Sequence, residues 1–243
     1  SSDFESQLPV RVKAGNAPDI AYIPQPGLLK TLATNNPGKL IPVTGQAATN
    51  LDKYYSPEWK NYGTVNGQVL ATPLGANVKS FVWYSPTAFK AKGYTVPKTW
   101  DELIALTDKI AADNPKAKAW CAGFESGTAT GWPGTDWIED LVLRQSGPEV
   151  YDQWVDNEVK FTDKPIADAF TAVGDILLNP SYVNAGFGDV KSINSTAFGD
   201  VAAKVADGTC PMTHQASFLT ANFQTVKNAA GEDIAAGSGW LEE

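Results

Sequence analysis

The sequence is poor in arginine and in positive charge. Arg11 and Arg144 are the only arginines among 243 residues, no run of Lys and Arg occurs, and the formal net charge is −8. An acidic surface repels nucleic acids and anionic membranes. Few arginines also mean few of the bidentate contacts that usually hold phosphate or carboxylate groups. We therefore expect no nucleic-acid partner and favour a neutral ligand, a description that sugars fit.

Sequence patterns of catalysis and of metal binding are also missing. His214 is the only histidine, and no HExxH, CxxC, EF-hand, Walker or GxGxxG pattern is present. One histidine without an evident partner gives no basis for a Ser-His-Asp triad. The other absences leave no dedicated metal or nucleotide site. We therefore expect no catalytic residue, no metal and no cofactor, and the chain is not predicted to be an enzyme.

Long apolar runs and a signal peptide are absent from the sequence as well. No stretch approaches the ~20 consecutive apolar residues that span a membrane. The chain opens at Ser1-Ser2-Asp3, which suits a mature form from which a signal or a lipid anchor was removed.

Cysteine is scarce, since Cys121 and Cys210 are the only two. An even number permits one disulfide in an oxidising compartment, and two free buried thiols fit the sequence equally well. A bridge across so long a loop would stabilise the fold by roughly 4–5 kcal/mol in the chain-entropy model.

The spacing of apolar residues alternates between the helical and the extended type. Helical spacing predicts helices over residues 3–14, 136–146, 163–178 and 197–206, and a capping box at Thr99 to Glu102 begins another. Short apolar runs predict strands at 19–23, 81–84, 120–124 and 209–213, with a hairpin turn at Asn66-Gly67. Alternating strands and helices are typical of an α/β fold.

A series of short motifs occurs in one order along nearly the whole chain. The stretches are Ala14 to Ile20, Gly27 to Leu29, Leu40 to Pro42, Gly67 to Pro73, Val82 to Tyr84, Pro97 to Leu103 and Phe198 to Met212. The series resembles the family 1 extracellular solute-binding proteins, relatives of maltose-binding protein, and Pro97 to Leu103 is its most specific part. Within them the chain looks closest to the α-glucoside-binding branch, on the stretches Trp120 to Gly123, Thr130 to Pro133, Thr135 to Asp140 and His214 to Phe218.

The resemblance implies a periplasmic-binding-protein-like type II fold, in which two α/β lobes surround a ligand cleft. Residues 1–87 would then form part of lobe one, and residues 88–235 most of lobe two. Residues 236–243 would start a return segment or be a trimmed end. Members of the family are usually much longer, so we expect a chain truncated at both ends.

The resemblance also implies a function in transport. It implies capture of a carbohydrate, of the α-glucoside or malto-oligosaccharide type, for the permease subunits of an ABC importer. The expected protein is a monomer outside the cytoplasm, either periplasmic or lipid-anchored on the outer face of the cell membrane. In the α-glucoside branch the cysteines at these places look bonded, which implies a Cys121–Cys210 disulfide. Another neutral solute is the nearest alternative ligand.

Sugars present apolar ring faces and hydroxyl edges, so their sites combine aromatic platforms with planar polar groups. Together with the resemblance, this predicts ligand contacts from Gln25, Asn77, Glu125, Thr130, Trp132, Asp136, His214, Gln215 and Phe218. Trp132 is the favoured platform, and Phe218 matches a stacking aromatic of maltose-binding protein. Plainer roles compete with these: turns for Gln25 and Asn77, a helix cap for Asp136, and a structural contact for His214.

A glycoside hydrolase is the alternative from a different class. It needs two carboxylates a few Å apart across a sugar bond. Four acidic residues could supply them, although surface charge or helix-start charge is their plainer role: Glu125, Asp136, Glu139 and Asp140. A scaffold or adhesin is a third possibility, and it predicts no saturable binding of a small molecule.

Overall fold

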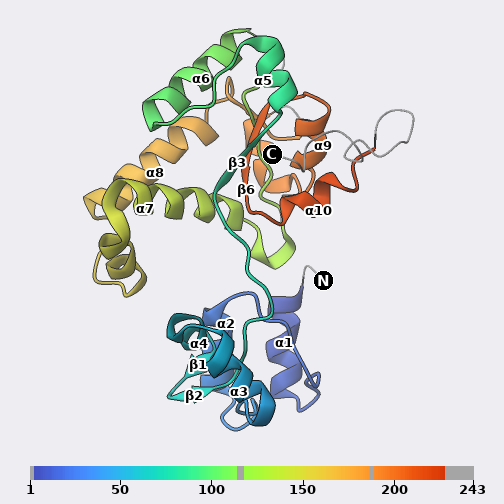
Figure 1. The fold of residues 1–243 in the computed structure, drawn as a ribbon, viewed down its shortest axis with the longest axis vertical. Helices are drawn as coiled ribbons and strands as arrows, with labels where there is room; N and C mark the ends of the chain where they lie inside the picture. Colours follow the sequence, from blue (N-terminus) through green and yellow to red (C-terminus); the bar gives the residue numbers. More distant parts are fainter. Residues whose placement is uncertain (1–2, 114–117, 187–188, 228–243) are drawn as a thin grey trace. The chain divides into compact units, whose positions relative to one another are not determined.

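The computed structural model describes residues 3–113, 118–186 and 189–227 (Figure 1). The chain divides into two compact units between Ala76 and Asn77. This division falls earlier than the lobe boundary at residue 87 that the resemblance implied. The correspondence of the two units to two lobes stays a prediction, and each unit is described by itself.

Unit 1 is a set of helices with one short hairpin. Its elements are α1 (Phe4–Lys13), α2 (Pro26–Asn35), α3 (Gly45–Tyr54), α4 (Pro57–Tyr62), β1 (Thr64–Val65) and β2 (Gln68–Val69). Leu8, Val12 and Leu32 form its small buried core, between α1 and α2. The hairpin turn is the predicted one, because Asn66 and Gly67 both take positive φ angles, 51° and 76°.

The strand predicted over residues 19–23 is wrong. These residues form no strand, and Ile20 is 90% exposed. A strand needs a neighbouring strand to satisfy its backbone N–H and C=O groups, and none of the residues described in unit 1 pairs with this segment. The apolar run at residues 19–23 predicted a buried strand, but no described part of unit 1 covers Ile20.

Unit 2 is built on a mixed four-stranded sheet. Its strands are β3 (Phe81–Tyr84), β4 (Trp120–Cys121), β5 (Val183–Asn184) and β6 (Met212–Gln215), in the order β3-β6-β4-β5. β3 runs antiparallel to β6, while β6, β4 and β5 are parallel. Pairing of β3 with β6, visible in Figure 1, is what ties the segment after Asn77 to unit 2.

Helices cover this sheet and build an α/β fold, as the sequence predicted. They are α5 (Pro86–Lys92), α6 (Trp100–Asp113), α7 (Trp132–Val155), α8 (Lys164–Leu177), α9 (Val201–Ala206) and α10 (Leu219–Phe223). The main core gathers fully buried side chains from α6, α8 and the sheet, among them Ile110, Trp120, Ile166, Ile176, Val183 and Met212. α8 packs along α7 (Figure 1). No helix in the described part of the chain has the length and apolarity to cross a membrane.

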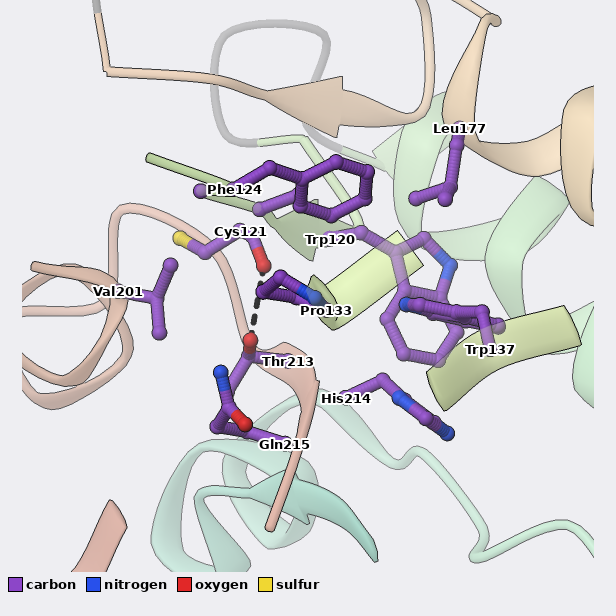
Figure 2. Close-up of a pocket in the computed structure, with 12 residues that line it drawn as sticks. Trp120, Cys121, Phe124, Pro133, Trp137, Leu177, Val201, Thr213, His214 and Gln215 are labelled. Carbon is purple, nitrogen blue, oxygen red and sulfur yellow. Dashed lines mark hydrogen bonds between the residues drawn. The ribbon is translucent and has the colours of Figure 1, made fainter. Parts of the chain in front are cut away.

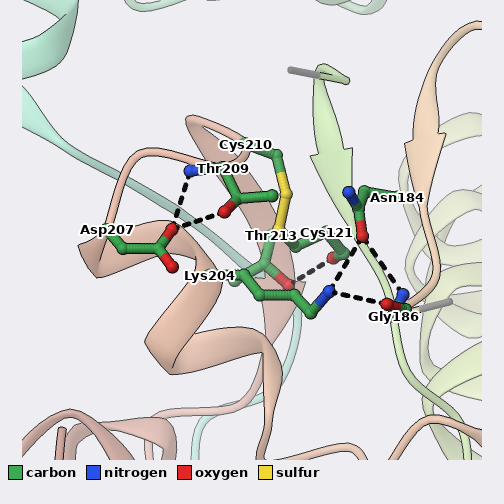
Figure 3. Close-up of a disulfide and its surroundings, with 8 residues drawn as sticks. All are labelled: Cys121, Asn184, Gly186, Lys204, Asp207, Thr209, Cys210 and Thr213. Atoms are coloured by element: carbon green, nitrogen blue, oxygen red, sulfur yellow. Dashed lines mark hydrogen bonds between the residues drawn. A yellow bond between two sulfur atoms is a disulfide. The ribbon is translucent and has the colours of Figure 1, made fainter. Parts of the chain in front are cut away.

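A disulfide joins Cys121 on β4 to Cys210, just before β6 (Figure 3). The two Cα atoms are 5.7 Å apart, within the usual range for a bridge. The Thr213 hydroxyl donates a hydrogen bond of 2.8 Å to the Cys121 carbonyl and reinforces the same junction. The structure thus confirms the pairing that the resemblance implied, and it fixes the start of β6 against β4.

Candidate ligand-binding site

Three aromatic rings from distant parts of the chain meet in unit 2. Trp132 is the first residue of α7, Phe198 precedes α9 and Phe218 precedes α10. The ring centroids of Trp132 lie 5.1 Å from Phe198 and 5.7 Å from Phe218, in edge-to-face contact. All three residues are half-buried. The cluster therefore offers a partly exposed aromatic surface, and we call it the aromatic platform.

The turn before α7 explains how Trp132 reaches this surface. Gly131 caps the helix with a φ of 107°, in the left-handed region where a side chain is strained. Pro133 follows within the first turn of α7, where a missing N–H costs nothing. The Gly-Trp-Pro sequence thus starts the helix abruptly and leaves the indole at its end.

A charged pair lies beside the platform. Lys79 Nζ is 2.9 Å from Oδ2 and 3.3 Å from Oδ1 of Asp136. The same ammonium lies 4.5 Å from the Trp132 ring centroid and 6.0 Å from that of Phe218. Asp136 is buried, and this burial raises the pKa of its carboxyl, while the hydrogen bond and charge of Lys79 oppose the shift. The pair combines a donor and an acceptor next to an apolar ring.

His214 is buried on β6, inside unit 2. Its ring stacks on Trp137, with centroids 4.2 Å apart and an interplanar angle of 25° (Figure 2). Its Nε2 is 3.5 Å from Asp140 Oδ2, longer than a good hydrogen bond. Neither ring nitrogen has a hydrogen-bond partner among the described residues. His214 is therefore a packed core residue of β6, and Asp140 is the polar group that lies near its Nε2.

Two further carboxylates continue the same face of α7. Burial, followed by repulsion from Asp136, raises the pKa of Glu139, although Tyr151 donates a hydrogen bond of 3.3 Å to it. Burial also acts on Asp140, but His214 and the 2.7 Å hydrogen bond from Arg144 outweigh it and lower the pKa. No group of three His, Cys, Asp or Glu side chains in the described ranges is placed to hold a metal ion.

A small cavity in unit 2 is lined by residues of β4, β6 and α7 (Figure 2). Its lining includes Trp120, Phe124, Pro133, Trp137, Thr213 and His214. The volume is about 10 Å³, room for roughly one water molecule. A sugar ring cannot enter it, so the aromatic platform and the charged pair are the better candidate for solute binding.

The other predicted contacts in unit 2 are engaged within their own loops. Glu125 Oε1 accepts a 2.7 Å hydrogen bond from the Gly127 N–H. Thr130 Oγ1 donates to the Gly127 carbonyl at 2.7 Å and so closes the same loop. Gln215 is buried, and its Oε1 accepts a 2.8 Å hydrogen bond from the Ala216 N–H. A ligand role for these residues stays a prediction.

Asn77 and Gln25 lie at element boundaries. Asn77 Oδ1 accepts a 3.4 Å hydrogen bond from the Ser217 hydroxyl, next to Phe218. Gln25 precedes α2 in unit 1, is exposed, and makes no side-chain cap to that helix. The structure therefore gathers Asn77, Trp132, Asp136, His214 and Phe218 in one region of unit 2. The participation of Gln25 stays a prediction.

Sequence reasoning missed Lys79 and Phe198. Lys79 lies in the short segment between Asn77 and β3, where no periodicity or motif marks it. Phe198 was noted only as part of a motif. The contacts that bring them to Trp132 and Asp136 span more than 50 positions of sequence, such as the Lys79–Asp136 pair with a separation of 57. No local signal could have found them.

Unit 2 thus brings an aromatic surface and a charged pair together on an α/β fold. The model of the family described as bacterial extracellular solute-binding protein matches residues 1–240, and the chain belongs to that family.

Two curated relatives match most of the chain. The alpha-glucosides-binding periplasmic protein AglE of Rhizobium meliloti is 41% identical over 242 residues, which are 96% of this chain and 51% of AglE. The osmoprotective compounds-binding protein GgtB of Synechocystis sp. is 42% identical over 199 residues, which are 81% of this chain and 45% of GgtB. The chain thus spans about half the length of these relatives.

Among solved structures, a chitin oligosaccharide binding protein matches with a TM-score of 0.71. The match covers 96% of this chain and 54% of that protein, at 20% sequence identity. At this low sequence identity the match shows the fold alone. The match supports the periplasmic-binding-protein-like architecture that the resemblance implied.

Proposed function

We propose that the chain is the solute-capturing part of an extracytoplasmic binding protein that serves an ABC importer. The proposed ligand is a neutral carbohydrate of the α-glucoside or malto-oligosaccharide type. The observation that carries the proposal is the aromatic platform of Trp132, Phe198 and Phe218 beside the Lys79–Asp136 pair.

The chemistry of this region matches a sugar in two respects. A pyranose presents an apolar C–H face, which packs on an aromatic ring, and a rim of hydroxyls, which donate and accept hydrogen bonds. Trp132 provides a ring, and Asp136 provides carboxylate acceptors. Since Asp136, Glu139 and Asp140 lie close together on α7, an anionic ligand would meet repulsion there.

One of the two curated relatives favours the same ligand class. One is named for binding α-glucosides and the other for binding osmoprotective compounds. Identities of 41% and 42% over most of this chain support a related solute. The α-glucoside type is our choice because the α-glucoside relative matches more of the chain.

The proposed mechanism is capture and delivery, without chemistry or cofactor. The sugar stacks on the aromatic platform and exchanges hydrogen bonds with Asp136 and neighbouring predicted contacts. In the complete binding protein, ligand contacts shift the population toward a closed form that the permease subunits accept. A monomer suffices for this cycle.

Calorimetric titration of the mature protein that contains this chain tests the proposal. The titrants are maltose, trehalose, sucrose and longer α-glucans, and each mixture is analysed afterwards for hydrolysis products. The proposal predicts saturable micromolar binding of at least one sugar and no product. Turnover would instead support a hydrolase that uses carboxylates such as Glu125 and Asp136, and no heat with any sugar would favour another neutral solute or a scaffold.

A further inference from the structure

Lys79 already occupies the surface that a stacked sugar would use. Its ammonium is 4.5 Å from the Trp132 centroid and 6.0 Å from the Phe218 centroid. These distances fall in the range of a cation–π contact. Phe198 and Phe218 also contact the indole, at interplanar angles of 64° and 61°. A sugar that stacks on the Lys79 side of Trp132 therefore has to displace the ammonium.

The backbone conformation and hydrogen bonds on both sides of Lys79 restrict where its side chain can lie. Ser80 has a φ of 66°, a left-handed conformation that is uncommon for a residue other than glycine. On the other side of Lys79, the Ser217 N–H donates to the Val78 carbonyl at 2.8 Å, and the Val78 N–H donates to Ser217 Oγ at 3.1 Å. The backbone is thus constrained on both sides of Lys79, by hydrogen bonds at Val78 and by the left-handed conformation of Ser80.

The two members of the charged pair differ greatly in their access to water. The Lys79 side chain is 47% exposed, whereas that of Asp136 is 9% exposed. A released ammonium can be hydrated by solvent at little cost. A buried carboxylate that loses its partner cannot, and an uncompensated buried charge is strongly unfavourable.

We propose that Lys79 is a specificity-determining residue that competes with the ligand for the face of Trp132. A ligand displaces it only by donating its own hydrogen bonds to Asp136. A polyhydroxylated ring meets both requirements, because it has an apolar face and hydroxyl donors. A purely apolar ring would leave Asp136 without a partner. This inference rests on the proposed function, and it explains how the site would select a sugar over a purely apolar ligand.

The Lys79→Ala variant tests the competition by calorimetry with maltose, trehalose and sucrose. The sugar that binds the wild type should bind the variant about two- to five-fold more tightly, since one cation–π contact no longer has to be broken. Lys109→Ala is the matched control, because Lys109 also pairs with an aspartate, Asp113 at 2.7 Å, and lies 5.5 Å from an aromatic centroid, Tyr94. The control should leave the affinity unchanged.

A second measurement examines the ligand-free protein and needs no sugar. After reductive methylation with ¹³C, the Lys79 methyl signal, assigned by its loss in Lys79→Ala, should be shifted upfield by the Trp132 ring current. Trp132→Leu should move the signal to the position typical of an exposed lysine. A signal at that position in the wild type would overturn the proposal.

The outcomes separate this proposal from the proposed function. Equal or weaker sugar binding by Lys79→Ala would overturn the competition and leave sugar capture standing. Binding by Lys79→Ala alone, with none by the wild type, would support the competition. No binding by either protein would overturn the proposed function and the competition together.

Discussion

At the scale of single residues, two carboxylates one turn apart on α7 have opposite electrostatic surroundings. Burial raises the pKa of Asp136 despite the opposing charge of Lys79. For Asp140, His214 and Arg144 outweigh the effect of burial and lower the pKa. The folded protein therefore disfavours the ionised form of Asp136 and favours that of Asp140.

These opposite directions predict opposite pH profiles for Asp136→Asn and Asp140→Asn. A raised carboxyl pKa means that the folded state holds the proton more tightly, so the stability contributed by Asp136 falls as pH rises above its usual pKa of 3.8. For Asp140 the sign reverses: its contribution is present above 3.8 and is lost as pH falls through the lowered pKa.

Urea unfolding of the wild type and both variants, at pH values between about 3 and 7, measures these contributions. The free energy of unfolding lost in Asp136→Asn should shrink as pH rises, and the loss in Asp140→Asn should grow. Parallel profiles for the two variants would show that the surroundings of the two carboxylates do not differ as described.

Residues of the candidate site were partly predictable from the sequence. Trp132 could be proposed because it stands between Gly131 and Pro133, although the helix was expected over 136–146 and α7 already begins at Trp132. His214 and Phe218 followed from a motif. Lys79 could not be found, because its position over Trp132 depends on a strained Ser80 and on a partner 57 positions away.

At the scale of elements, α7 is two helical segments joined at one glycine. Gly147 has φ 82° and ψ 171°, a conformation outside the helix. This region is essentially restricted to glycine, so Gly147 and the following Pro148 set the change of direction. The first segment carries Trp132, Asp136 and Asp140, and the junction therefore ends the site-bearing helix.

Gly147→Ala should destabilise unit 2 by about 1–3 kcal/mol through backbone strain alone, because an added Cβ would meet no atom within 4 Å. Gly174→Ala is the contrasting control within α8, where the new Cβ would lie 3.7 Å from Leu178 Cδ1, an ordinary contact. It should stabilise by about 0.5–1 kcal/mol. Chemical denaturation of both variants checks the pair, and equal effects on stability would refute the role of Gly147.

The disulfide between Cys121 and Cys210 connects elements 89 positions apart in sequence. Closing so long a loop stabilises by roughly 4–5 kcal/mol in the chain-entropy model. Replacing both cysteines by serine, or reducing them, should lower the free energy of unfolding by up to about this amount. Urea denaturation with and without a reductant measures the loss, and an unchanged midpoint would contradict a structural role.

Element prediction succeeded where the signal was local and failed where it depended on partners. Thr99 caps α6 as predicted, since the Glu102 N–H donates to Thr99 Oγ1 at 3.2 Å, and Glu102 Oε2 accepts from the Lys98 N–H at 2.6 Å. The hairpin turn at Asn66-Gly67 also forms. The strand at 19–23 does not, because a strand exists only with a neighbour. β4 ends at Cys121, earlier than its apolar run predicted, although the next residues still hydrogen-bond to neighbouring segments, as Ala122 does to Asn184.

At the scale of the whole molecule, the family is identified from features that extend along the chain and not from any single helix or strand. The order of motifs along the chain indicated the family, and the family model matches residues 1–240. Composition contributed the net charge of −8, and the scarcity of arginine led to the expectation of a neutral ligand. Neither could place the division between the units, which depends on the pairing of β3 with β6.

The central claim is that the aromatic platform of unit 2 binds a sugar, and one calorimetric comparison tests it most directly. Wild type, Trp132→Ala and Phe170→Ala are titrated with the best-binding sugar of the α-glucoside panel, after circular dichroism shows that all three are folded. Phe170 is the control, an aromatic residue on α8 that is 45% exposed. We predict that Trp132→Ala weakens binding by more than about five-fold, or about 1 kcal/mol, while Phe170→Ala has no effect. An unchanged affinity in folded Trp132→Ala would contradict the platform and with it the proposed site.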